Sequence, residues 1–412
     1  MTVSAARSIL PPLSADEQQH SAALATRLRA AIAAAGDWLS FERFMEIALY
    51  EPGLGYYSAG SAKFGAAGDF VTAPEVSDLF SFCVARQCAE VLATTGGEIL
   101  ELGAGTGRMA AVVLESLAAV GVLPERYAIL EVSADLAERQ RARLQSLPPA
   151  LLERVVWLER LPETPVRGVV LANEVLDALP CQRFVIGNDG EALELGVSLS
   201  QSGSAAFGER TGAAEGSLAT AFSERARVPD VSLAVAVDKL LAELPGALPA
   251  GYTTELCPRV DPWVASVGEL LERGMILLFD YGLPRSHYYH PQRVSGTLRC
   301  HFKQRAHDDP YINVGVQDIT AWVDFTRVAE ASLAAALDVA GFCTQAAFLL
   351  ATGIEALVAE AVGTVERARR AGEARRLLMP GEMGESFKAM ALTRDYDAPL
   401  GGFALQDLRH SL

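Results

Sequence analysis

Three alternate glycines, Gly103, Gly105 and Gly107, follow a short apolar run and precede a stretch with helical spacing. A backbone without Cβ atoms turns tightly and lets a ligand approach, and the free N–H groups at the start of the next helix face that ligand. In the dinucleotide fingerprint G-x-G-x-x-G the third glycine comes one position later, where this chain has Arg108. The pattern therefore predicts a cofactor-binding turn and disfavours a nicotinamide or flavin dinucleotide. The turn can then hold a nucleotide cofactor or a cofactor of another class, and a glycine turn that binds nothing is the alternative to a cofactor site.

Two further polar positions follow expected strands. Tyr127–Leu130 is a short apolar run, as buried parallel strands are, and Glu131 comes directly after it. In open α/β sheets the ligand lies outside the carboxyl ends of the strands, so Glu131 is placed to accept hydrogen bonds from the hydroxyls of a ribose. Residues 168–172 form a similar run that leads into Asn173 and Glu174, which the same rule places at the chemistry. A solvent-exposed glutamate at 131 and a helix cap at 173–174 are the simpler alternatives.

The composition narrows the class of partner. A formal net charge of −16 argues against nucleic acid, because nucleic-acid binding depends on clustered Lys and Arg, and it suits a cationic substrate. No charge-free run of about 20 apolar residues is present, so no membrane insertion is expected. The N-terminus lacks the features of a signal or transit peptide, which makes the cytoplasm the expected location. Six scattered cysteines without a C-x-x-C pair indicate neither a disulfide framework nor a thiolate zinc site.

The order of apolar runs and helical stretches in this 412-residue chain predicts an α/β fold with a Rossmann-like sheet. An N-terminal extension of helices and a loop precedes that sheet, and a large insertion separates its fourth and fifth strands. The expected divisions are 1–95 for the extension and an active-site loop, 96–183 and 251–395 for the core, 184–250 for an inserted β-rich subdomain of hairpins, and 283–317 for a substrate-facing loop.

Some single elements are also predicted. A helix is expected from Ser21 to Ala35, with residues 1–15 outside any element. Another helix is expected from Arg327 to Ala340, with Thr326 as its cap. Phe342–Leu350 is the expected sixth strand, and residues 354–371 are expected to be helical.

The glycine turn belongs to a longer series of motifs. Glu101 completes the pattern E-x-G-x-G-x-G, which resembles the first motif of class I methyltransferases, whose cofactor is S-adenosylmethionine. The motifs Y-E-P-G-x-G-Y-Y at 50–57, G-D-F-x-T-x-P-E-x-S at 68–77 and N-E-x-x-D-A-L-P at 173–180 occur with it in one order. This ordered set resembles the MidA-like family over residues of about 40–395. Mitochondrial members of that family are complex I assembly factors that methylate an arginine.

The resemblance implies a class I methyltransferase sheet that binds S-adenosylmethionine and holds no metal. The expected cofactor contacts are Asp69, Thr72, Glu101, Gly103, Ala104, Gly105, Gly107, Glu131 and Asn173. It also implies a protein substrate, a quinone-side subunit of respiratory complex I or its counterpart, and a homodimer is left open. The eukaryotic relatives are expected in the mitochondrial matrix and a bacterial protein in the cytoplasm.

Transfer of a methyl group to a guanidinium calls for carboxylates that bind the charge and orient one nitrogen. Glu75, Glu174 and Asp280 are the expected catalytic residues, with N-terminal helix capping as the alternative for Glu75. The glycine-rich loop from Tyr50 to Glu75 is expected to cover the cofactor. A scaffold that binds S-adenosylmethionine with little turnover and a small-molecule methyltransferase are the competing functions.

Histidines and a cysteine gather in residues 283–317 and raise the question of a zinc site. They are His287, His290, Cys300, His301 and His307, and no pairing among them has a standard four-ligand spacing. A loop that faces the substrate is therefore the preferred interpretation of this segment.

Overall fold

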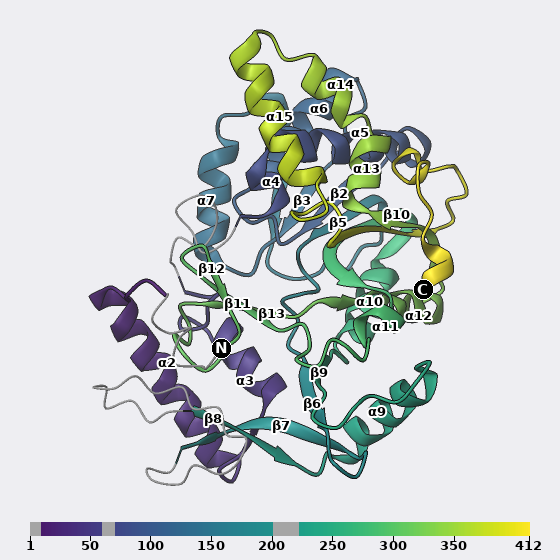
Figure 1. The fold of residues 1–412 in the computed structure, drawn as a ribbon. Coiled ribbons are helices and arrows are strands. Elements are labelled where there is room, and N and C mark those ends of the chain that lie inside the picture. The colour runs from purple at the N-terminus through teal and green to yellow at the C-terminus, as the bar shows by residue number, and fades with distance from the viewer. Residues whose placement is uncertain (1–9, 60–70, 201–221) are drawn as a thin grey trace.

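The computed structural model describes residues 10–59, 71–200 and 222–412 of the chain. Its main sheet follows the order β4–β3–β2–β5–β10–β16–β15, and β14 pairs with the end of β10. Figure 1 shows the central strands β3, β2, β5 and β10 of this sheet among the helices. The strands β4, β3, β2, β5 and β10 run parallel, whereas β16 is antiparallel to both of its neighbours. The bounds are β2 (Glu98–Leu102), β3 (Tyr127–Leu130), β4 (Val155–Leu158), β5 (Val166–Asn173), β10 (Leu271–Leu283), β14 (Val323–Asp324), β15 (Asp338–Thr344) and β16 (Phe387–Arg394).

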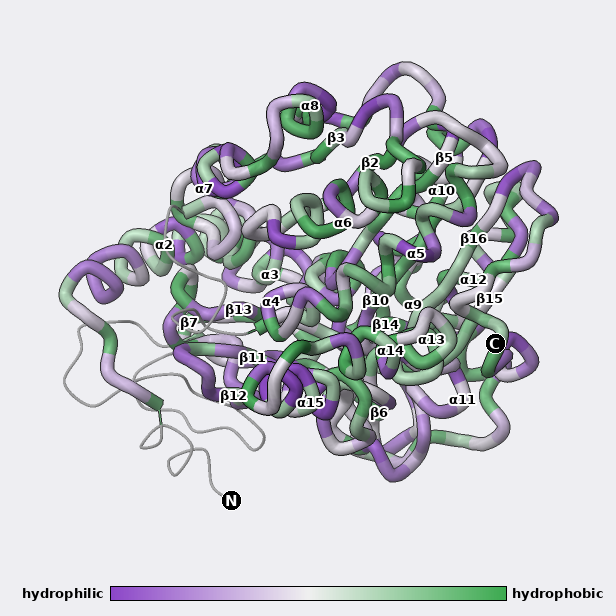
Figure 2. The backbone as a smooth tube through the Cα atoms, turned by 90° about the horizontal axis from the view of Figure 1, so that it is seen from above, coloured by the Kyte–Doolittle hydropathy of each residue, from purple (hydrophilic) through white to green (hydrophobic). Residues whose placement is uncertain are grey.

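Both faces of this sheet are buried because alternate residues of each strand point to opposite sides. On β10, Met275 and Leu277 pack with helices α5, α6, α13 and α15, whereas Ile276 and Leu278 pack with α10 and α12. Figure 2 shows the result as largely hydrophobic central strands and hydrophilic stretches along outer helices such as α7 and α15. The helix bounds are α5 (Asp78–Thr95), α6 (Arg108–Ala119), α7 (Ala134–Leu144), α8 (Pro149–Leu152), α10 (Val260–Leu270), α12 (Phe325–Ala334), α13 (Gln345–Ala351), α14 (Ile354–Ala359) and α15 (Thr364–Leu378). This arrangement is the α/β sheet that the sequence predicts.

A second sheet, in the order β1–β7–β6–β9 with β8 beside β7, joins the N-terminal helices to the segment after β5. Its strands and helices are α2 (Ala15–Ala34), β1 (Leu39–Ser40), α3 (Phe41–Tyr50), β6 (Gln182–Ile186), β7 (Ala192–Leu199), β8 (Phe222–Arg227), α9 (Val231–Glu243) and β9 (Thr253–Leu256). The antiparallel pairs agree with the hairpins expected in 184–250, but helix α9 was not expected there. Buried Leu233, Val237 and Leu240 seat α9 against the sheet.

A third sheet occupies the segment that was expected to be a loop. Residues 283–317 hold α11 (Arg285–Tyr288), β11 (Arg299–Phe302) and β12 (Arg305–His307), and β11 also pairs with β13 (Asp318–Thr320). Cys300 is buried in this sheet, and His301 and Cys300 pair across it with Ala306 and His307. The alternating pattern of these short strands is too brief to be told from a loop by sequence.

Three predictions near the C-terminus and one near the N-terminus are wrong in part. β15 ends at Thr344, whose side chain caps helix α13, so residues 345–350 are helical and not part of a strand. Helix α12 begins at Phe325 and ends at Ala334, and Asp324, not Thr326, caps it. A break at 360–363 divides residues 354–378 into α14 and α15. Helix α2 begins at Ala15 because Ser14 and Glu17 form a capping box.

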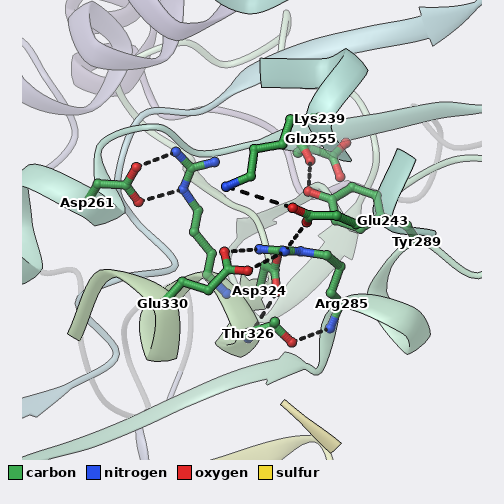
Figure 3. Close-up of polar contacts among 10 residues, drawn as sticks. Lys239, Glu243, Glu255, Asp261, Arg285, Tyr289, Asp324, Thr326 and Glu330 are labelled. Atoms are coloured by element: carbon green, nitrogen blue, oxygen red, sulfur yellow. Dashed lines mark hydrogen bonds and ion pairs between the residues drawn. The ribbon is translucent and has the colours of Figure 1, made fainter. Parts of the chain in front are cut away.

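A charged network joins the inserted helix α9 to the core (Figure 3). The Arg285 guanidinium donates to both carboxylate oxygens of Glu330, at 2.8 and 2.7 Å, and also bonds Glu243 of α9 and Asp324. Beside it, Arg327 makes two bonds to Asp261 at the start of α10. The network thus fixes α9, α10, α11 and α12 relative to one another.

Across the three described ranges, none of the helices combines the length and the apolar character needed to cross a membrane. The six cysteines are all free thiols, and five of them are buried.

Candidate active site

A cavity of about 560 Å³ lies at the carboxyl ends of the central strands. The residues after β2, β3 and β5 line it, together with the first two turns of α10 and the described parts of the loop that follows α3. Nine of the residues expected from the sequence contribute to the lining, namely Thr72, Glu75, Glu101, Gly103, Ala104, Gly105, Glu131, Asn173 and Glu174. The rule that ligands bind at this edge of an open sheet therefore agrees with the geometry.

The glycine turn forms one wall of the cavity. Gly105 has φ of +52°, which disfavours a side chain, and a Cβ there would meet no protein atom within 4 Å. Gly107 adopts φ of +79° at the start of α6, and a Cβ there would crowd Gln140 at 3.4 Å. Gly107 is absent from the cavity lining, so it shapes the turn, whereas Gly105 leaves open space for a ligand.

Two buried glutamates, Glu131 and Glu101, also line the cavity. Glu131 is 9% exposed, and its carboxylate accepts hydrogen bonds from Ser133 N at 2.8 Å and from Gln140 Nε2 at 2.9 Å. Glu101 is buried and accepts a hydrogen bond from the Tyr127 hydroxyl at 2.8 Å. Burial raises the pKa of Glu101 to about 7, more than the hydrogen bond from Tyr127 lowers it.

Asn173 and Glu174 occupy the end of β5. Glu174 has φ of +54°, an uncommon and strained conformation for a residue with a side chain, and its N–H donates to Phe279 O of the neighbouring strand. Its Oε1 accepts from Ala73 N at 3.3 Å and from Asn173 Nδ2 at 3.2 Å. Burial, followed by the nearby charge of Asp177, raises the pKa of Glu174 to about 8. The strand end therefore presents a carboxyl group that is held in place and easily protonated.

Asp280 lies beneath this strand end and does not line the cavity. Its Oδ2 accepts from the backbone N–H groups of Leu176 and Asp177, at 2.9 and 3.2 Å, and its Oδ1 accepts from Tyr281 N at 3.0 Å. Burial and the charges of Asp177 and Glu174 raise the pKa of Asp280. The structure therefore does not bring the three expected catalytic acids together, because Asp280 uses its oxygens to hold the turn that follows Glu174.

Glu75 lines the cavity from the short helix α4 (Ala73–Val76). Its Oε1 accepts a hydrogen bond from Thr106 Oγ1 of the glycine turn, and Arg108 Nη1 donates to its backbone O at 2.9 Å. Arg108 also bonds Asp78 at 2.8 Å. Glu75 therefore joins the segment that carries Thr72 to the glycine turn. Thr72 is the N-cap residue of α4, and its side chain makes no capping hydrogen bond.

Asp69 and most of the glycine-rich part of the loop between Tyr50 and Glu75 fall at 60–70, outside the described residues. Its expected contact with the cofactor and the expected closure of this loop stay predictions. For the histidines of 283–317, the described residues contain no group of three or more His, Cys, Asp or Glu side chains that could hold a metal ion.

Comparisons with known proteins identify the family. A family model described as "Putative S-adenosyl-L-methionine-dependent methyltransferase" matches residues 83–343. The chain belongs to this family of methyltransferases. A Burkholderia thailandensis protein crystallised with S-adenosyl-homocysteine is 40% identical to the methyltransferase, with a TM-score of 0.87 over 98% of this chain and 100% of that one. A second crystal structure from the same organism is 38% identical, with a TM-score of 0.85.

Curated relatives of this methyltransferase are more distant. The Drosophila melanogaster "Protein arginine methyltransferase NDUFAF7 homolog, mitochondrial" is 29% identical over 411 residues, covering 93% of this chain and 87% of the relative. The Caenorhabditis elegans protein of the same name is 26% identical over 381 residues, covering 86% and 82%. These findings confirm the MidA-like family, the class I methyltransferase fold with additional sheets, and S-adenosylmethionine as the cofactor.

The cavity suits this cofactor on its own geometry. The open space beside Gly105 admits a ligand against the backbone, and Glu131 is oriented by two donors at the end of β3. A carboxylate held in that way can accept hydrogen bonds from ribose hydroxyls. We therefore keep the glycine turn and Glu131 as the expected cofactor contacts of the methyltransferase.

Several residues at the cavity escaped the sequence analysis. Gln140 of α7 donates to Gly105 O at 3.0 Å as well as to Glu131, and its own Oε1 accepts from Trp157 Nε1 at 3.0 Å. No local signal marks a glutamine in the middle of a helix as a ligand-site residue. Gln140 does not line the cavity itself, whereas Tyr50, Tyr57, Asp177 and Trp263 do and were also missed. Tyr50, Tyr57 and Asp177 lie within the quoted motifs, so the motifs were a signal that could have found them.

Proposed function

We propose that this methyltransferase methylates an arginine side chain of a protein partner, the large quinone-side subunit of respiratory complex I or its bacterial counterpart. Arginine as the acceptor is supported by the names of the relatives, which are called protein arginine methyltransferases. The observation that carries the proposal is the Glu174 carboxyl group, which lines the cavity at the end of β5 and forms no ion pair within the described part of the chain.

A guanidinium would supply the cation that this carboxyl group lacks. Because burial raises its pKa to about 8, Glu174 carries a proton for much of the time at neutral pH in the absence of a cation. An approaching guanidinium lowers that pKa and ionises the group. The carboxylate can then accept N–H bonds from the guanidinium and fix its plane.

The chemistry divides between the cofactor and this chain. When bound, S-adenosylmethionine supplies an electrophilic methyl group, and S-adenosyl-homocysteine is left after transfer. The accepting nitrogen gains the methyl group and loses one proton, which Glu174 takes as general base. In this proposal Asp280 and Glu75 act as positioning residues. Asp280 fixes the turn after Glu174, and Glu75 fixes the α4 segment, whose Ala73 N–H donates to Glu174.

The test compares Glu174→Gln with Glu138→Gln, a variant of an exposed acid on α7. Glu174→Gln keeps the shape of the side chain and removes its charge and its capacity to take a proton. We expect methylation of the partner subunit to fall by at least a hundredfold, while affinity for S-adenosyl-homocysteine changes by less than about tenfold, or about 1.4 kcal/mol. Glu138→Gln should match the wild type in both measurements.

Mass spectrometry of the partner subunit identifies the product. A methyl-arginine should be present in cells that carry the protein and absent in cells that lack it. A methylated small molecule with no modified protein would overturn the proposal in favour of a small-molecule methyltransferase. Cofactor binding without any methylated product would overturn it in favour of a scaffold.

A further inference from the structure

Asp177 lies three residues after Glu174 and lines the same cavity, yet the proposed function gives it no role. It is only 5% exposed, and its buried Oδ1 has no hydrogen-bond partner in the described ranges. An unpaired buried acceptor costs free energy, so natural structures seldom keep one without a reason. Asp280 differs, because both of its oxygens accept backbone N–H groups. Asp177 therefore has unused capacity to bind a donor at the cavity.

Two tyrosines form a wall beside Asp177. The rings of Tyr50 and Tyr57 stack with centroids 5.5 Å apart and an interplanar angle of 25°, and both residues line the cavity. The Tyr50 hydroxyl donates to Ala178 O at 2.9 Å, and the Tyr57 hydroxyl donates to Asp318 Oδ1 at 2.9 Å. The first of these bonds ties the ring to the residue that follows Asp177. The aromatic wall and the carboxyl group are thus held in one arrangement.

The charges around Asp177 are unbalanced. Glu174, Asp280 and Asp318 are the acids near it, and Tyr281 is the neighbouring phenol. Arg259 is the cation that acts on Tyr50, but it already pairs with Glu42 and Glu46. Burial raises the pKa of Asp177 more than the nearby Tyr281 hydroxyl and Ala178 backbone N–H lower it. A cation that entered this end of the cavity would meet Glu174 and Asp177, neither of which forms an ion pair within the described ranges.

We propose that Asp177, with the Tyr50–Tyr57 wall, forms a subsite that selects a planar cation as the methyl acceptor. This inference rests on the proposed function and adds to it residues that determine specificity. A guanidinium stacks on aromatic faces and donates two parallel N–H bonds, whereas a lysine ammonium is compact and strongly hydrated. A neutral urea group has the same plane but lacks the charge. The subsite should therefore favour arginine over both lysine and citrulline.

The experiment uses the full chain with three capped peptides that differ only in a central arginine, citrulline or lysine. Peptide binding is measured by calorimetry in the presence of S-adenosyl-homocysteine, and turnover is measured with S-adenosylmethionine. In the wild type we expect the arginine peptide to bind at least tenfold more tightly than either of the others. Asp177→Asn should reduce this preference to less than threefold and raise KM more than it lowers kcat, while affinity for S-adenosyl-homocysteine stays within threefold.

Control variants and a second measurement keep the inference testable if Asp177→Asn does not fold. Asp238→Asn changes an exposed acid on α9 and should leave the preference intact. In the wild type, calorimetry in buffers of different ionisation enthalpy should show proton release from Glu174 when the arginine peptide binds at pH 7, and none with citrulline, which reports on the proposed function separately from the subsite. Tyr50→Phe keeps the ring and should retain most of the preference for arginine, whereas Tyr57→Leu should lose it.

The outcomes separate this inference from the proposed function. An unchanged arginine preference in Asp177→Asn, on an arginine that the wild type methylates, would overturn the subsite and leave the function standing. A Tyr57→Leu variant that keeps the full preference for arginine would also overturn it. If the wild type methylates only a small molecule, both proposals fall.

Discussion

At the glycine-turn end of the cavity, the Glu131 carboxylate accepts hydrogen bonds from Ser133 N and Gln140 Nε2, whereas at the other end Asp177 Oδ1 and Asn173 Oδ1 have no partner among the described residues. At the first end the protein's own donors already orient the carboxylate, and such a preformed site suits the cofactor. The second end keeps buried polar atoms unpaired, and this favours a donor that arrives with the substrate. Under the proposed function, this difference divides residues that hold the cofactor from residues that recognise the acceptor, and it moves Asn173, expected from the sequence as a cofactor contact, to the second group.

The largest expected effect is on cofactor affinity and comes from a substitution in the glycine turn. In Gly105→Val a branched side chain must adopt φ near +52° and would extend into the open space of the cavity. We expect calorimetry with S-adenosyl-homocysteine to show at least a hundredfold loss of affinity. Gly121 also has positive φ, +74°, and open space around its Cβ position, but it does not line the cavity. Gly121→Val therefore separates backbone strain from loss of ligand space, and an equal loss in both variants would refute the assignment of Gly105.

A smaller effect is expected at Gln140. Gln140→Leu removes the donor to Glu131 and to Gly105 O, so the carboxylate loses one of the groups that orient it. Loss of a hydrogen bond to a charged group costs about 1.5–3 kcal/mol, and we expect S-adenosyl-homocysteine affinity to fall by about tenfold or more. Trp157→Phe removes the indole donor to Gln140 Oε1 and part of the ring, but it leaves both Gln140 donors in place and should cost less than threefold. Peptide affinity should not follow the cofactor affinity, since Gln140 lies at the other end.

The smallest expected effect is on thermal stability, and it comes from Glu174 at the acceptor end of the cavity. The pKa of Glu174 is raised from 4.5 to about 8, so the folded protein binds more protons than the unfolded chain between these values, and stability falls as pH rises through this window. Glu174→Gln removes this pH-dependent loss of stability. We expect its Tm to exceed that of the wild type by about 2–4 °C at pH 8 and the difference to narrow toward pH 5. Thermal unfolding of both proteins, with Glu138→Gln as control, tests this, and a lower Tm at pH 8 would contradict it.

Local sequence signals were sufficient for much of the fold. Ser40, Ser77 and Ser133 cap the helices that follow them, and each capping bond joins residues two or three positions apart. The parallel strands were recognisable because burial on both faces leaves continuous apolar runs. Helix α9 and the boundary between β15 and α13 were missed, since packing against distant strands decides them.

The candidate site shows the same division. The positions of Gly105, Glu131 and Glu174 at strand ends followed from the sheet rule, because each comes shortly after an apolar run in the sequence. The contact of Gln140 with Gly105 spans 35 positions, and the contact of Tyr50 with Ala178 spans 128. Asp280 directly follows an apolar run and Asp177 lies in the motif at 173–180, and only the fold shows that the first supports the backbone while the second lines the cavity.

The place of β16 in the main sheet affects how the protein is made. β16 comes near the end of the chain but lies between β10 and β15, so it pairs along both of its edges. Because synthesis proceeds from the N-terminus, the edge of β10 stays unpaired on the ribosome until Phe387–Arg394 emerges. Such an open edge is a template for pairing with other chains. A chain that stops before Phe387 would keep this edge, so premature termination should yield an aggregating product rather than a partly active enzyme.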